Sequence, residues 1–577
     1  MNNREIADIF HSIADILEIK AENPFRIRAY RRAAQIIEGL SQSIKDIYIN
    51  DKLINIPGIG EGIAEKISEL IQTGKLKEYE EIKKSVPAGL LEMLNISSVG
   101  PKTVALIYKE LGITNVEELE KAVKDNKLAK FPGMGEKKEE NILRGIKILR
   151  ETKERIPIYE AELIADKIIK QLREIQAVDK ISIAGSLRRR RETIGDIDIL
   201  VASDKPAQVM DVFTTLPNVK QILAKGNTRS SVRIESGRQI DIRVVQTDSF
   251  GTALHYFTGS KAHNIRIREL GIKNNLKINE YGIFKRGKSP EEQDEKIGGS
   301  KEIDVFKSIG MPYISPEMRE DRGEIEAALL NKLPKLVEIE NIKGDLHVHS
   351  NWSDGTNSIE EMAEAAIKRG YQYIAICDHS KSLKIAKGLD EKQLMERREE
   401  IDKLNNKYRN FQILSGIELE IHINGELDFS DDILRSLDVV VAAIHTGFSQ
   451  DERVNTARII KAMKNKNVDI IAHPTGRLLG KREGYKIDIP AILKAAGDTG
   501  TALEINAFPE RLDLADIYLQ EAKEKGAKFA INTDAHSISQ LDFAKFGVGV
   551  ARRGWLEKQD VINCLNIDEL KKILGTS

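Results

Sequence analysis

Cysteine is scarce in this sequence, and long apolar runs and an excess of charge of one sign are missing. Its 577 residues include only two cysteines, Cys377 and Cys564, which argues against a disulfide framework. No apolar run is long enough to span a membrane, and the N-terminus carries polar and charged residues where a signal peptide needs an apolar core. The formal net charge is −1, so any basic surface for nucleic acid must be local. These absences predict a cytoplasmic protein with no membrane partner.

What is present suffices for several domains. The composition is 41% hydrophobic and 31% charged, which is typical of a globular protein with sizeable cores. Single cores stop growing well below 577 residues, so the chain must divide. The apolar pattern is helical up to about residue 155, mixed α/β up to about residue 341, and alternates between strands and helices after that.

Three similar segments separate the helical patterns of residues 1–150. They lie at 56–60, 96–102 and 131–138, and each has the form apolar-Pro-Gly-apolar-Gly or apolar-x-x-apolar-Gly. Such glycines allow a tight hairpin whose N–H groups, at the start of the next helix, can approach a phosphate. One segment alone is more often a plain helix–helix turn, and the first could be structural, but three favour a grip on the backbone of duplex DNA. The residues expected at DNA are Gly58, Gly60, Gly100, Lys102, Gly133, Gly135 and Lys137.

A basic turn followed by two acids marks the central third. Gly185-Ser186 and four arginines precede a strand that carries Asp196 and Asp198. Because side chains alternate along a strand, the two acids face the same way, and neighbouring carboxylates usually share a cation. The turn offers N–H groups, a hydroxyl and guanidinium groups, which suit phosphates. The acid pair alone would favour a solvated strand edge; together with the turn it predicts metal-dependent phosphoryl or nucleotidyl transfer.

A third acid is expected beside this pair. Residues 238–244 alternate as a strand, with Asp241 between Ile240 and Ile242. Three carboxylates on neighbouring strands can hold two Mg²⁺ ions about 3.5–4 Å apart. One ion would lower the pKa of an attacking hydroxyl, and the other would neutralise the phosphates and the leaving pyrophosphate.

Six of the ten histidines fall at strand ends between residues 347 and 536. Seven apolar strands follow one another at intervals of about 30 residues, the length of a strand-plus-helix unit, which predicts an incomplete parallel (β/α) barrel. Active sites of barrels lie at the carboxyl ends of the strands. A single buried histidine is usually a hydrogen-bonded core residue, but six with three acids predict a metal cluster. The nine expected ligands are His347, His349, Asp354, His379, Glu418, His445, His473, Asp534 and His536.

The donor set of this cluster limits its metals and its chemistry. Imidazole with carboxylate suits Zn²⁺, Mn²⁺ or Fe, and the lack of thiolates makes a closed structural zinc less favoured. Nine ligands exceed what one tetrahedral ion needs, so two or three ions are expected. Water activated there would attack a phosphodiester or phosphomonoester, and Arg477, just after His473, could steady a phosphate.

The central third resembles the family X DNA polymerases. The resemblance covers the Gly-Ser turn, the three acids, the run 256–260, the run 278–281 and the segment 311–324. It implies a nucleotidyltransferase palm and a thumb, with dNTPs and gapped or nicked double-stranded DNA as substrates. Asp196, Asp198 and Asp241 would hold two Mg²⁺ or Mn²⁺ ions. The nucleotide-binding residues that it implies are Ser186, Arg189, Gly195, Tyr256, Phe257, Gly259, Lys261 and Asn264.

Some positions carry less specific expectations or depart from the family. Arg268 would contact the template strand, while Arg190 and Arg191 would form only a basic rim. Gln239 stands where animal repair members have an arginine before the third acid, which would weaken the orientation of that carboxylate. Lys261 occupies a position that is acidic in those members.

The N-terminal third fits the same family, whose first domain binds the 5′-phosphate of a gap. Residues 63–67 resemble the segment with the Schiff-base lysine of deoxyribose-phosphate lyases, which would make Lys66 a nucleophile. Tyr30 also matches the family and is expected to bind DNA. Arg26 and Gly62 stand where supporting lysines are expected. A Schiff base requires a partly neutral amine, so a phosphate-binding lysine is an equally good interpretation.

The C-terminal third resembles the PHP (polymerase and histidinol phosphatase) family through its Asp-x-His-x-His start at Asp345 and its Asp-x-His end at Asp534. The resemblance implies 3′→5′ exonuclease activity, with abasic-site endonuclease and 3′-phosphatase activity as further options. Asp354 replaces a histidine of some members, which favours Mn²⁺ at one site. The family's pattern implies three ligand groups: His347, His349, Glu418 and Asp534; Glu418, His445 and His473; Asp354, His379 and His536.

The order of these parts is typical of bacterial and archaeal family X polymerases with a C-terminal PHP domain. The sequence predicts a monomer that fills short gaps in DNA repair. One alternative is a nucleotidyltransferase with a non-DNA acceptor fused to a small-molecule phosphatase, which would need no grip on a duplex. The expected domains are 1–85 (small helical, lyase-like), 86–155 (fingers with helix-hairpin-helix motifs), 156–250 (palm), 251–322 (thumb), 323–341 (linker) and 342–577 (distorted (β/α)7 PHP barrel).

Overall fold

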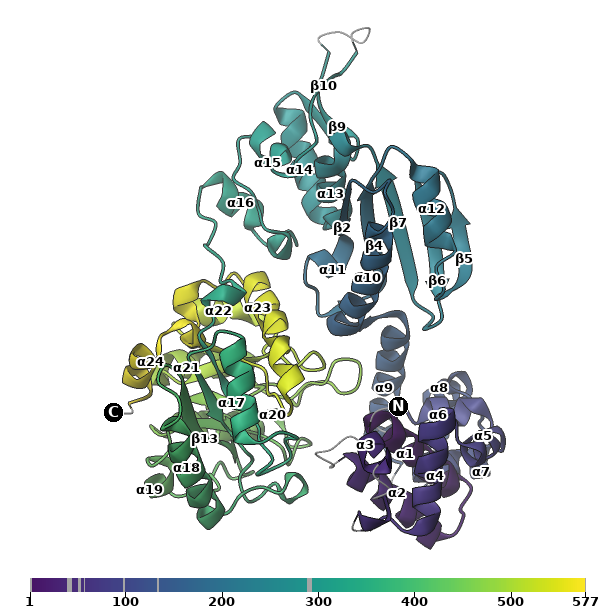
Figure 1. Ribbon diagram of the computed structural model, residues 1–577, viewed down its shortest axis with the longest axis vertical. Coiled ribbons are helices and arrows are strands. Elements are labelled where there is room, and N and C mark those ends of the chain that lie inside the picture. The colour runs from purple at the N-terminus through teal and green to yellow at the C-terminus, as the bar shows by residue number, and fades with distance from the viewer. Residues whose placement is uncertain are drawn as a thin grey trace.

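A computed structural model of the chain describes residues 3–38, 44–49, 53–56, 58–96, 99–131, 134–287 and 293–575. A helical region lies at the lower right of Figure 1, an α/β region above it, and a barrel at the lower left. The long helix α9 connects the helical region to the α/β region. No helix in the described part is long and apolar enough to cross a membrane.

The N-terminal region is all-helical, as predicted. Helix α1 buries its apolar face on α2, and its last residues Ile16 and Ile19 reach into a second core built by the later helices. The helices are α1 (Asn3–Ile19), α2 (Pro24–Glu38), α3 (Ile44–Ile49), α4 (Glu61–Thr73), α5 (Lys77–Lys84), α6 (Ala88–Met93), α7 (Pro101–Leu111), α8 (Val116–Lys124) and α9 (Glu136–Glu154).

A five-stranded sheet forms the middle of the molecule, in the order β2-β4-β7-β6-β5. Strands β4 and β7 pair in parallel and place Asp198 directly beside Asp241, while the other neighbours are antiparallel. The short pair β1 (Ile156–Pro157) and β3 (Thr193–Ile194) precedes β4. The sheet strands and their helices are β2 (Lys180–Ile183), β4 (Asp196–Ala202), β5 (Val219–Lys225), β6 (Arg229–Ile234), β7 (Gln239–Val245), α10 (Ile158–Arg173) and α12 (Pro206–Thr214).

The expected basic turn after residue 184 is a one-turn helix, α11 (Gly185–Arg188). Leu187 is fully buried, which coils the segment onto the core. Gly185 has φ +58°, and a Cβ atom there would lie 2.0 Å from the carboxylate oxygen Oδ2 of Asp198. Only glycine therefore lets this helix start against the acid.

The run 256–260, which the glycine and serine at its end would make a turn, is partly helical. Residues 256–258 close α13 (Phe250–Thr258), and only the following Gly259 and Ser260 leave the helix. The remaining elements of this part are α14 (Lys261–Lys273), β8 (Leu276–Asn279), β9 (Gly282–Lys285), β10 (Glu295–Gly298), α15 (Ile303–Ser308) and α16 (Glu324–Leu329).

Seven parallel strands follow in chain order, β11 to β17, and confirm the predicted (β/α)7 barrel. A bridge between Val348 and Ala535 brings the two edges together and nearly closes it. The strands are β11 (Gly344–Val348), β12 (Tyr373–Ile376), β13 (Gln412–Glu420), β14 (Val439–Ala443), β15 (Ile470–Ile471), β16 (Ala502–Asn506) and β17 (Phe529–Asn532). The helices are α17 (Ile359–Lys368), α18 (Glu391–Asn405), α19 (Asp431–Leu434), α20 (Glu452–Met463), α21 (Ile489–Thr499), α22 (Asp516–Glu524), α23 (Ala544–Arg553) and α24 (Ile567–Leu574).

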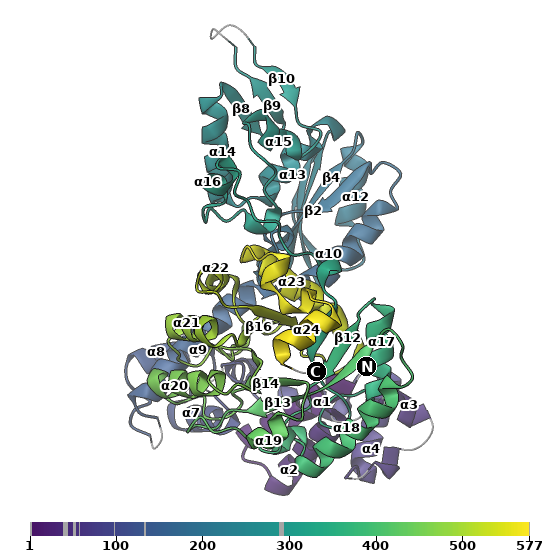
Figure 2. The same ribbon diagram turned by 90° about the vertical axis from the view of Figure 1, so that its left-hand side faces the viewer.

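Helix α23 fastens the barrel to the central sheet region. Figures 1 and 2 show it on the side of the barrel nearest the sheet. Tyr159 of α10 packs edge-on against Phe543 and Phe546, with ring centroids 5.2 Å and 5.9 Å apart. Glu162 of α10 accepts ion pairs both from Arg190 (2.8 Å) and from Lys545 of α23 (2.6 Å). Apolar packing and charge pairing therefore hold the two regions together.

Candidate active sites

The three acids of the central sheet lie together as predicted. Asp196, Asp198 and Asp241 each offer a carboxylate oxygen within 4.8 Å of the other two. Burial and the charges of Asp196 and Asp241 raise the pKa of Asp198 to about 7. Carboxylates held this close repel one another, and a divalent cation between them relieves that repulsion. The donor set therefore fits a divalent metal.

Two neighbours fix the orientation of Asp241. The hydroxyl of Ser231 on β6 donates to its Oδ1 oxygen, and the side-chain amide of Gln239 donates to Oδ2 at 3.0 Å. Gln239 was expected to orient this carboxylate less well than an arginine would. Because both oxygens of Asp241 have a donor, its orientation is nevertheless fixed. Ser231 was not predicted, and no motif around it could have identified it.

A cavity of about 580 Å³, here called the central pocket, opens beside the acids. It gathers most of the predicted nucleotide residues from α11, α13 and α14. Gly195 does not line it but directly precedes β4. Two further arginines lie in its wall: Arg155, which had no predicted role, and Arg191, which was expected only as part of a basic rim. The predicted residues that line the pocket are Asp196, Asp198, Ser186, Arg189, Tyr256, Phe257, Gly259, Lys261, Asn264 and Arg268.

Protein groups hold two of these side chains in place. Arg189 donates to the backbone oxygen of Thr258 at 2.6 Å and to the carboxylate of Glu320 at 3.0 Å. Asn264 donates to the backbone oxygen of Tyr256 at 2.7 Å. The pocket is therefore positioned by contacts between segments that lie far apart in the sequence.

The glycine hairpins start helices as expected. Gly60 and Gly100 precede α4 and α7, and neither helix start has a side-chain cap, so backbone N–H groups face outward there. Gly135 precedes α9, and Lys102 and Lys137 are exposed. Gly58 has φ +92°, which favours glycine. The predicted residue Gly133 lies outside the described residues.

Lys66 on α4 is tied to an acid. Its amine lies 2.6 Å from a carboxylate oxygen of Glu78 on α5, which also accepts from Arg26 and from Tyr30, each at 2.6 Å. Although burial alone would raise it, these partners lower the pKa of Glu78 to about 2. A carboxylate so placed stabilises an ammonium, whereas Schiff-base chemistry requires a neutral amine. The local geometry therefore favours the phosphate-binding or structural interpretation of Lys66.

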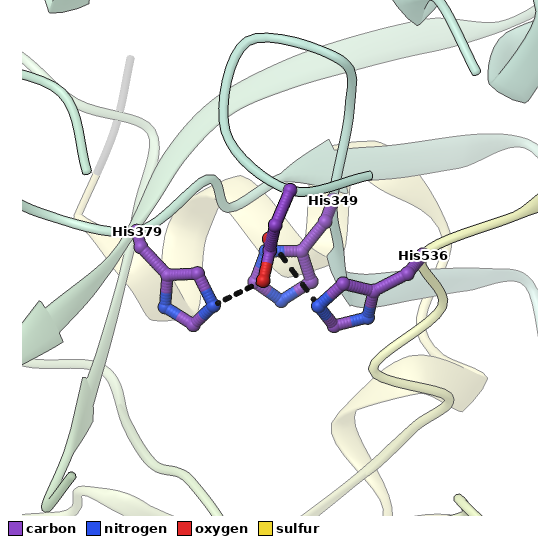
Figure 3. A group of neighbouring side chains, drawn as sticks. His349, His379 and His536 are labelled. Atoms are coloured by element: carbon purple, nitrogen blue, oxygen red, sulfur yellow. Dashed lines mark ion pairs between the residues drawn. The ribbon is translucent and has the colours of Figure 1, made fainter. Parts of the chain in front are cut away.

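All nine predicted ligands of the barrel converge at the carboxyl ends of its strands. The donor atoms of eight of them form three overlapping groups, each compact enough for one ion, and His473 belongs to none of the three. Figure 3 shows His349, His379 and His536 turned toward one carboxylate; this is Asp354, 3.5 Å from His379 and 3.4 Å from His536. The groups are His349, Asp354, His379 and His536; His347, His349 and Asp534; His379, Glu418 and His445.

Glu418 lies at the middle of this cluster, within β13 rather than at its end. Its Oε1 lies 3.1 Å from His445 and 3.0 Å from His473, and its Oε2 lies 2.7 Å from His379. One carboxylate thus joins the groups. The grouping differs from the expectation in three ways. His349 and His379 are shared between groups, Glu418 is absent from the group of His347, and His379 stands in place of His473 beside Glu418 and His445.

The barrel cluster fits divalent metals. The Nε2 atoms of His347 and His349 face one another at 3.2 Å. Burial and the neighbouring His536 lower the pKa of His349 to about 4, which leaves a neutral imidazole with a free lone pair. The buried Nδ1 of His349 has no hydrogen-bond partner among the described residues. An imidazole lone pair beside several carboxylates is a donor set that suits a divalent metal.

Carboxylates that were not predicted orient these histidines. Glu504 accepts from Nδ1 of His347 at 2.8 Å, and Glu420 lies 2.9 Å from Nδ1 of His445. Such partners fix the tautomer of a ligating histidine. Glu504 lies on the sixth barrel strand, β16, and an acid on a barrel strand could have been predicted to face the metal cluster.

Arg477 lies away from the cluster that it was expected to serve. Its guanidinium forms an ion pair with Glu192, beside β3, at 2.5 Å, and its Nε donates to the backbone oxygen of Arg511 at 3.0 Å. The side chain therefore reaches across the contact between the barrel and the central region.

Comparison with family models covers most of the chain. A helix-hairpin-helix domain matches residues 1–76, and a SAM-like helix-hairpin-helix tandem matches 90–147. The DNA polymerase beta palm matches 155–246, and the DNA polymerase beta thumb matches 253–320. The PHP domain matches 345–508.

Relatives resemble either the whole chain or one part of it. The DNA polymerase/3′-5′ exonuclease PolX of Bacillus subtilis (strain 168) is 42% identical over 576 residues, which is 100% of this chain and 99% of that protein. DNA polymerase lambda of Rattus norvegicus is 26% identical over 50% of this chain and 52% of its own length. A probable phosphatase of Thermoanaerobacter sp. (strain X514) is 31% identical over 40% of this chain and 93% of its own length.

Proposed function

This chain belongs to the family X DNA polymerases that carry a C-terminal PHP domain, and on that premise we propose that it fills short gaps in DNA and removes 3′ ends. The observation that carries the proposal is the presence of two clusters of candidate metal ligands on one chain, one in the palm and one in the barrel. A duplex grip by the hairpins fits a DNA substrate. A nucleotidyltransferase with another acceptor is not favoured, because the whole-length relative is a DNA polymerase.

We assign divalent ions to both centres. Asp196, Asp198 and Asp241 would hold two Mg²⁺ or Mn²⁺ ions, and the barrel cluster would hold two or three ions of Mn²⁺, Zn²⁺ or Fe. Such ions would lower the pKa of an attacking hydroxyl or water and neutralise charge on the phosphates.

In the palm, the protein's own groups would bind and orient the substrates. Arg189 and Ser186 are placed to hold the triphosphate, since both line the central pocket next to the acids. Tyr256 and Phe257 would lie against the sugar. Asp241, held by two donors, would orient the primer hydroxyl for in-line attack on the α-phosphate.

In the barrel, the acids behind the histidines would keep the donors in place. Glu504 fixes the tautomer of His347, and Glu420 fixes that of His445. Both would keep the Nε2 lone pairs directed at the ions. The substrate would be the 3′-terminal phosphodiester, with abasic sites and 3′-phosphates as further substrates.

The helical region would hold the DNA. We propose that the helix starts after Gly60, Gly100 and Gly135, with Lys102 and Lys137, contact phosphates of gapped or nicked duplex DNA. Asn264 would meet the incoming base, and Arg268 the template strand. A monomeric state, a cytoplasmic location and a role for Gly133 stay predictions.

Separate inactivation of the two centres tests this assignment. Asp196→Ala with Asp198→Ala should lower dNTP incorporation on a 1-nucleotide gap by at least about 1,000-fold, because the ions contribute several kcal/mol to such reactions. Degradation of single-stranded DNA should persist. His347→Ala with His349→Ala should give the reverse pattern. Incorporation that survives the first pair, or Mn²⁺-dependent exonuclease that survives the second, would contradict the assignment.

A further inference from the structure

A cavity of about 380 Å³ lies between the palm and the barrel, apart from both metal centres. We call it the junction pocket. One wall comes from residues 155–157 and 192–193 of the palm, and the other from the barrel loop 477–484. Its principal lining side chains are Arg155, Glu192, Thr193, Arg477, Leu479 and Arg482.

Two of its arginines have no acidic partner among the described residues. Arg155 donates from Nε to the hydroxyl of Thr193 at 2.9 Å and also to that residue's backbone oxygen. Arg482 donates to the backbone oxygen of Gly476 at 2.8 Å and lies 4.4 Å over the ring of Phe448. Their positive charges are therefore available to a ligand.

The surroundings of these two arginines are themselves cationic. Burial and the nearby Arg191 lower the pKa of Arg155, and burial and the nearby Arg511 lower that of Arg482. Cations crowded in this way repel one another, and an anion between them would offset the repulsion. The pocket lining holds three arginines (Arg155, Arg477 and Arg482) against two acids (Glu192 and Glu483), which leaves an excess of one positive charge for an anion.

The pocket is joined to the palm centre. Arg155 lines both the junction pocket and the central pocket, where Arg189 and Arg191 also lie. Thr193, in its wall, is three residues before Asp196. A strand that leaves the central pocket past Arg155 therefore enters the junction pocket.

The pocket is joined to the barrel centre in the same way. Arg477 follows the candidate ligand His473 by four residues and contacts the backbone of Arg511. The Arg511 guanidinium lies 3.5 Å from the carboxylate of Asp534, a member of the barrel cluster. A line of arginines therefore runs from one metal centre to the other.

We propose that the junction pocket binds a phosphodiester of a single DNA strand that passes from the palm to the barrel. A frayed primer 3′ end would then move between the two centres without release of the DNA. Guanidinium groups bind phosphate in paired hydrogen bonds, and Pro157 and Leu479 offer apolar surface to a sugar or base. The cavity has room for about one nucleotide, by comparison with ligand pockets of about 300–1,000 Å³, and not for a duplex. This inference rests on the proposed function.

Binding of a single-stranded tail tests the pocket directly. The substrate is gapped DNA whose primer ends in a short unpaired thymidine tail, measured with a chelator to prevent hydrolysis, over a series of salt concentrations. Arg482→Gln should weaken binding about 3- to 10-fold and lower the log–log salt slope by about 0.7, the value for one phosphate contact on a single strand. Lys481→Gln is the matched control. It removes the same charge one residue away, on an exposed lysine paired with Glu510 outside the pocket.

Removal of a negative charge from the pocket distinguishes a loss of phosphate binding from a folding defect. The carboxylate of Glu192 forms an ion pair with Arg477. Glu192→Gln should therefore free that guanidinium for a phosphate and tighten binding of the tail. Damage to the fold would weaken binding instead. The inference is overturned if Arg482→Gln matches Lys481→Gln, or if Glu192→Gln weakens binding.

Transfer within one encounter tests the consequence. Enzyme bound to a gapped substrate with a mismatched primer 3′ end receives dNTPs, Mn²⁺ and an excess of trap DNA together. The fraction of primers that are trimmed and then extended should fall about 3- to 10-fold in Arg482→Gln, while extension of a matched primer stays unchanged. If the wild type does not trim the mismatched 3′ end at all, the proposed function fails. If it trims that end and all variants then extend the same fraction of primers, only the pocket inference fails.

Discussion

Truncation of one barrel arginine, Arg553→Ala, should weaken nucleotide binding in the palm. Arg553 ends α23 and is buried. It donates to the backbone oxygen of Arg189 at 2.7 Å and to the carboxylate of Glu320 at 2.9 Å. The same carboxylate accepts from the Arg189 guanidinium at 3.0 Å. The barrel therefore shares an acid with the residue assigned to the triphosphate.

The magnitude follows from how Glu320 divides its hydrogen bonds. Without Arg553, two arginines remain to neutralise the Glu320 carboxylate: Arg189, and Arg191 at 3.5 Å. It should then hold Arg189 more firmly and withhold it from a triphosphate. A charge-assisted hydrogen bond contributes about 1.5–3 kcal/mol, so a loss near the lower end raises the KM for dNTP about tenfold. The kcat value should change little, because the acids of the palm are untouched.

Stability should fall less than for an ordinary buried ion pair. Breaking such a pair costs about 3–5 kcal/mol when it leaves a charge without a partner. Here Glu320 keeps Arg189, and Asp516, the other acid at Arg553, keeps Arg322 at 2.9 Å. We therefore expect a loss of about 1–3 kcal/mol, the cost of partial loss of hydrogen bonds.

Arg552→Ala is the control, since Arg552 lies in the same interface but contacts Glu317 (2.8 Å) and the backbone oxygen of Val337. Initial rates of incorporation on a 1-nucleotide gap, across dNTP concentrations, give KM and kcat for both variants. A KM for Arg553→Ala equal to that of the wild type would refute the reasoning. So would an equal rise in Arg552→Ala, which would mean that general loosening of the interface is responsible.

Three further changes have defined outcomes. Borohydride should trap no adduct between the wild-type protein and a 5′-deoxyribose-phosphate end, because Lys66 is paired with Glu78; strong trapping would show that the pair opens on DNA. Mn²⁺ added to chelated protein should raise its melting temperature through binding to the folded state, and Glu418→Gln should lose most of that rise. Burial raises the pKa of Asp469 from 3.8 to about 7, so its charged form destabilises the fold as pH rises between these values and fully above them. Asp469→Asn should therefore raise the melting temperature at pH 8 and leave it nearly unchanged below pH 4, and an equal rise at both would exclude this cause.

The candidate metal ligands were predictable because they lie in short segments with a regular period. Asp196 and Asp198 share a face through the two-residue period of a strand, and Asp241 stands on a strand of the same kind. The barrel ligands follow one rule, which is the carboxyl end of each successive strand. The rule failed in detail: His347 and Glu418 lie inside β11 and β13, Asp354 follows the end of β11 by six residues, and β16 supplies none of the nine ligands.

The groups that position these residues could not be predicted in the same way. Ser231 is a single polar residue without a motif, and Glu320 lies in the segment 311–324 but carried no predicted role. Tertiary contact alone brings them to Asp241 and Arg189. The turn predicted at Gly185 became a helix because Leu187 is buried, which depends on the core that surrounds it. Local patterns carry no information on such contacts.

The arginine run 188–191 has a different environment in the structure from the one that its sequence predicts, because the barrel packs beside it. As a sequence it is a basic segment for phosphates, with Arg190 and Arg191 as a rim. In the structure each member meets a protein carboxylate: Arg188 meets Glu302, Arg189 and Arg191 meet Glu320, and Arg190 meets Glu162. Two of these three acids also pair with α23 of the barrel. The arginine run therefore lies beside the palm acids and also forms part of the contact with the PHP domain. The position of that domain and the affinity of the palm for nucleotides should therefore depend on each other.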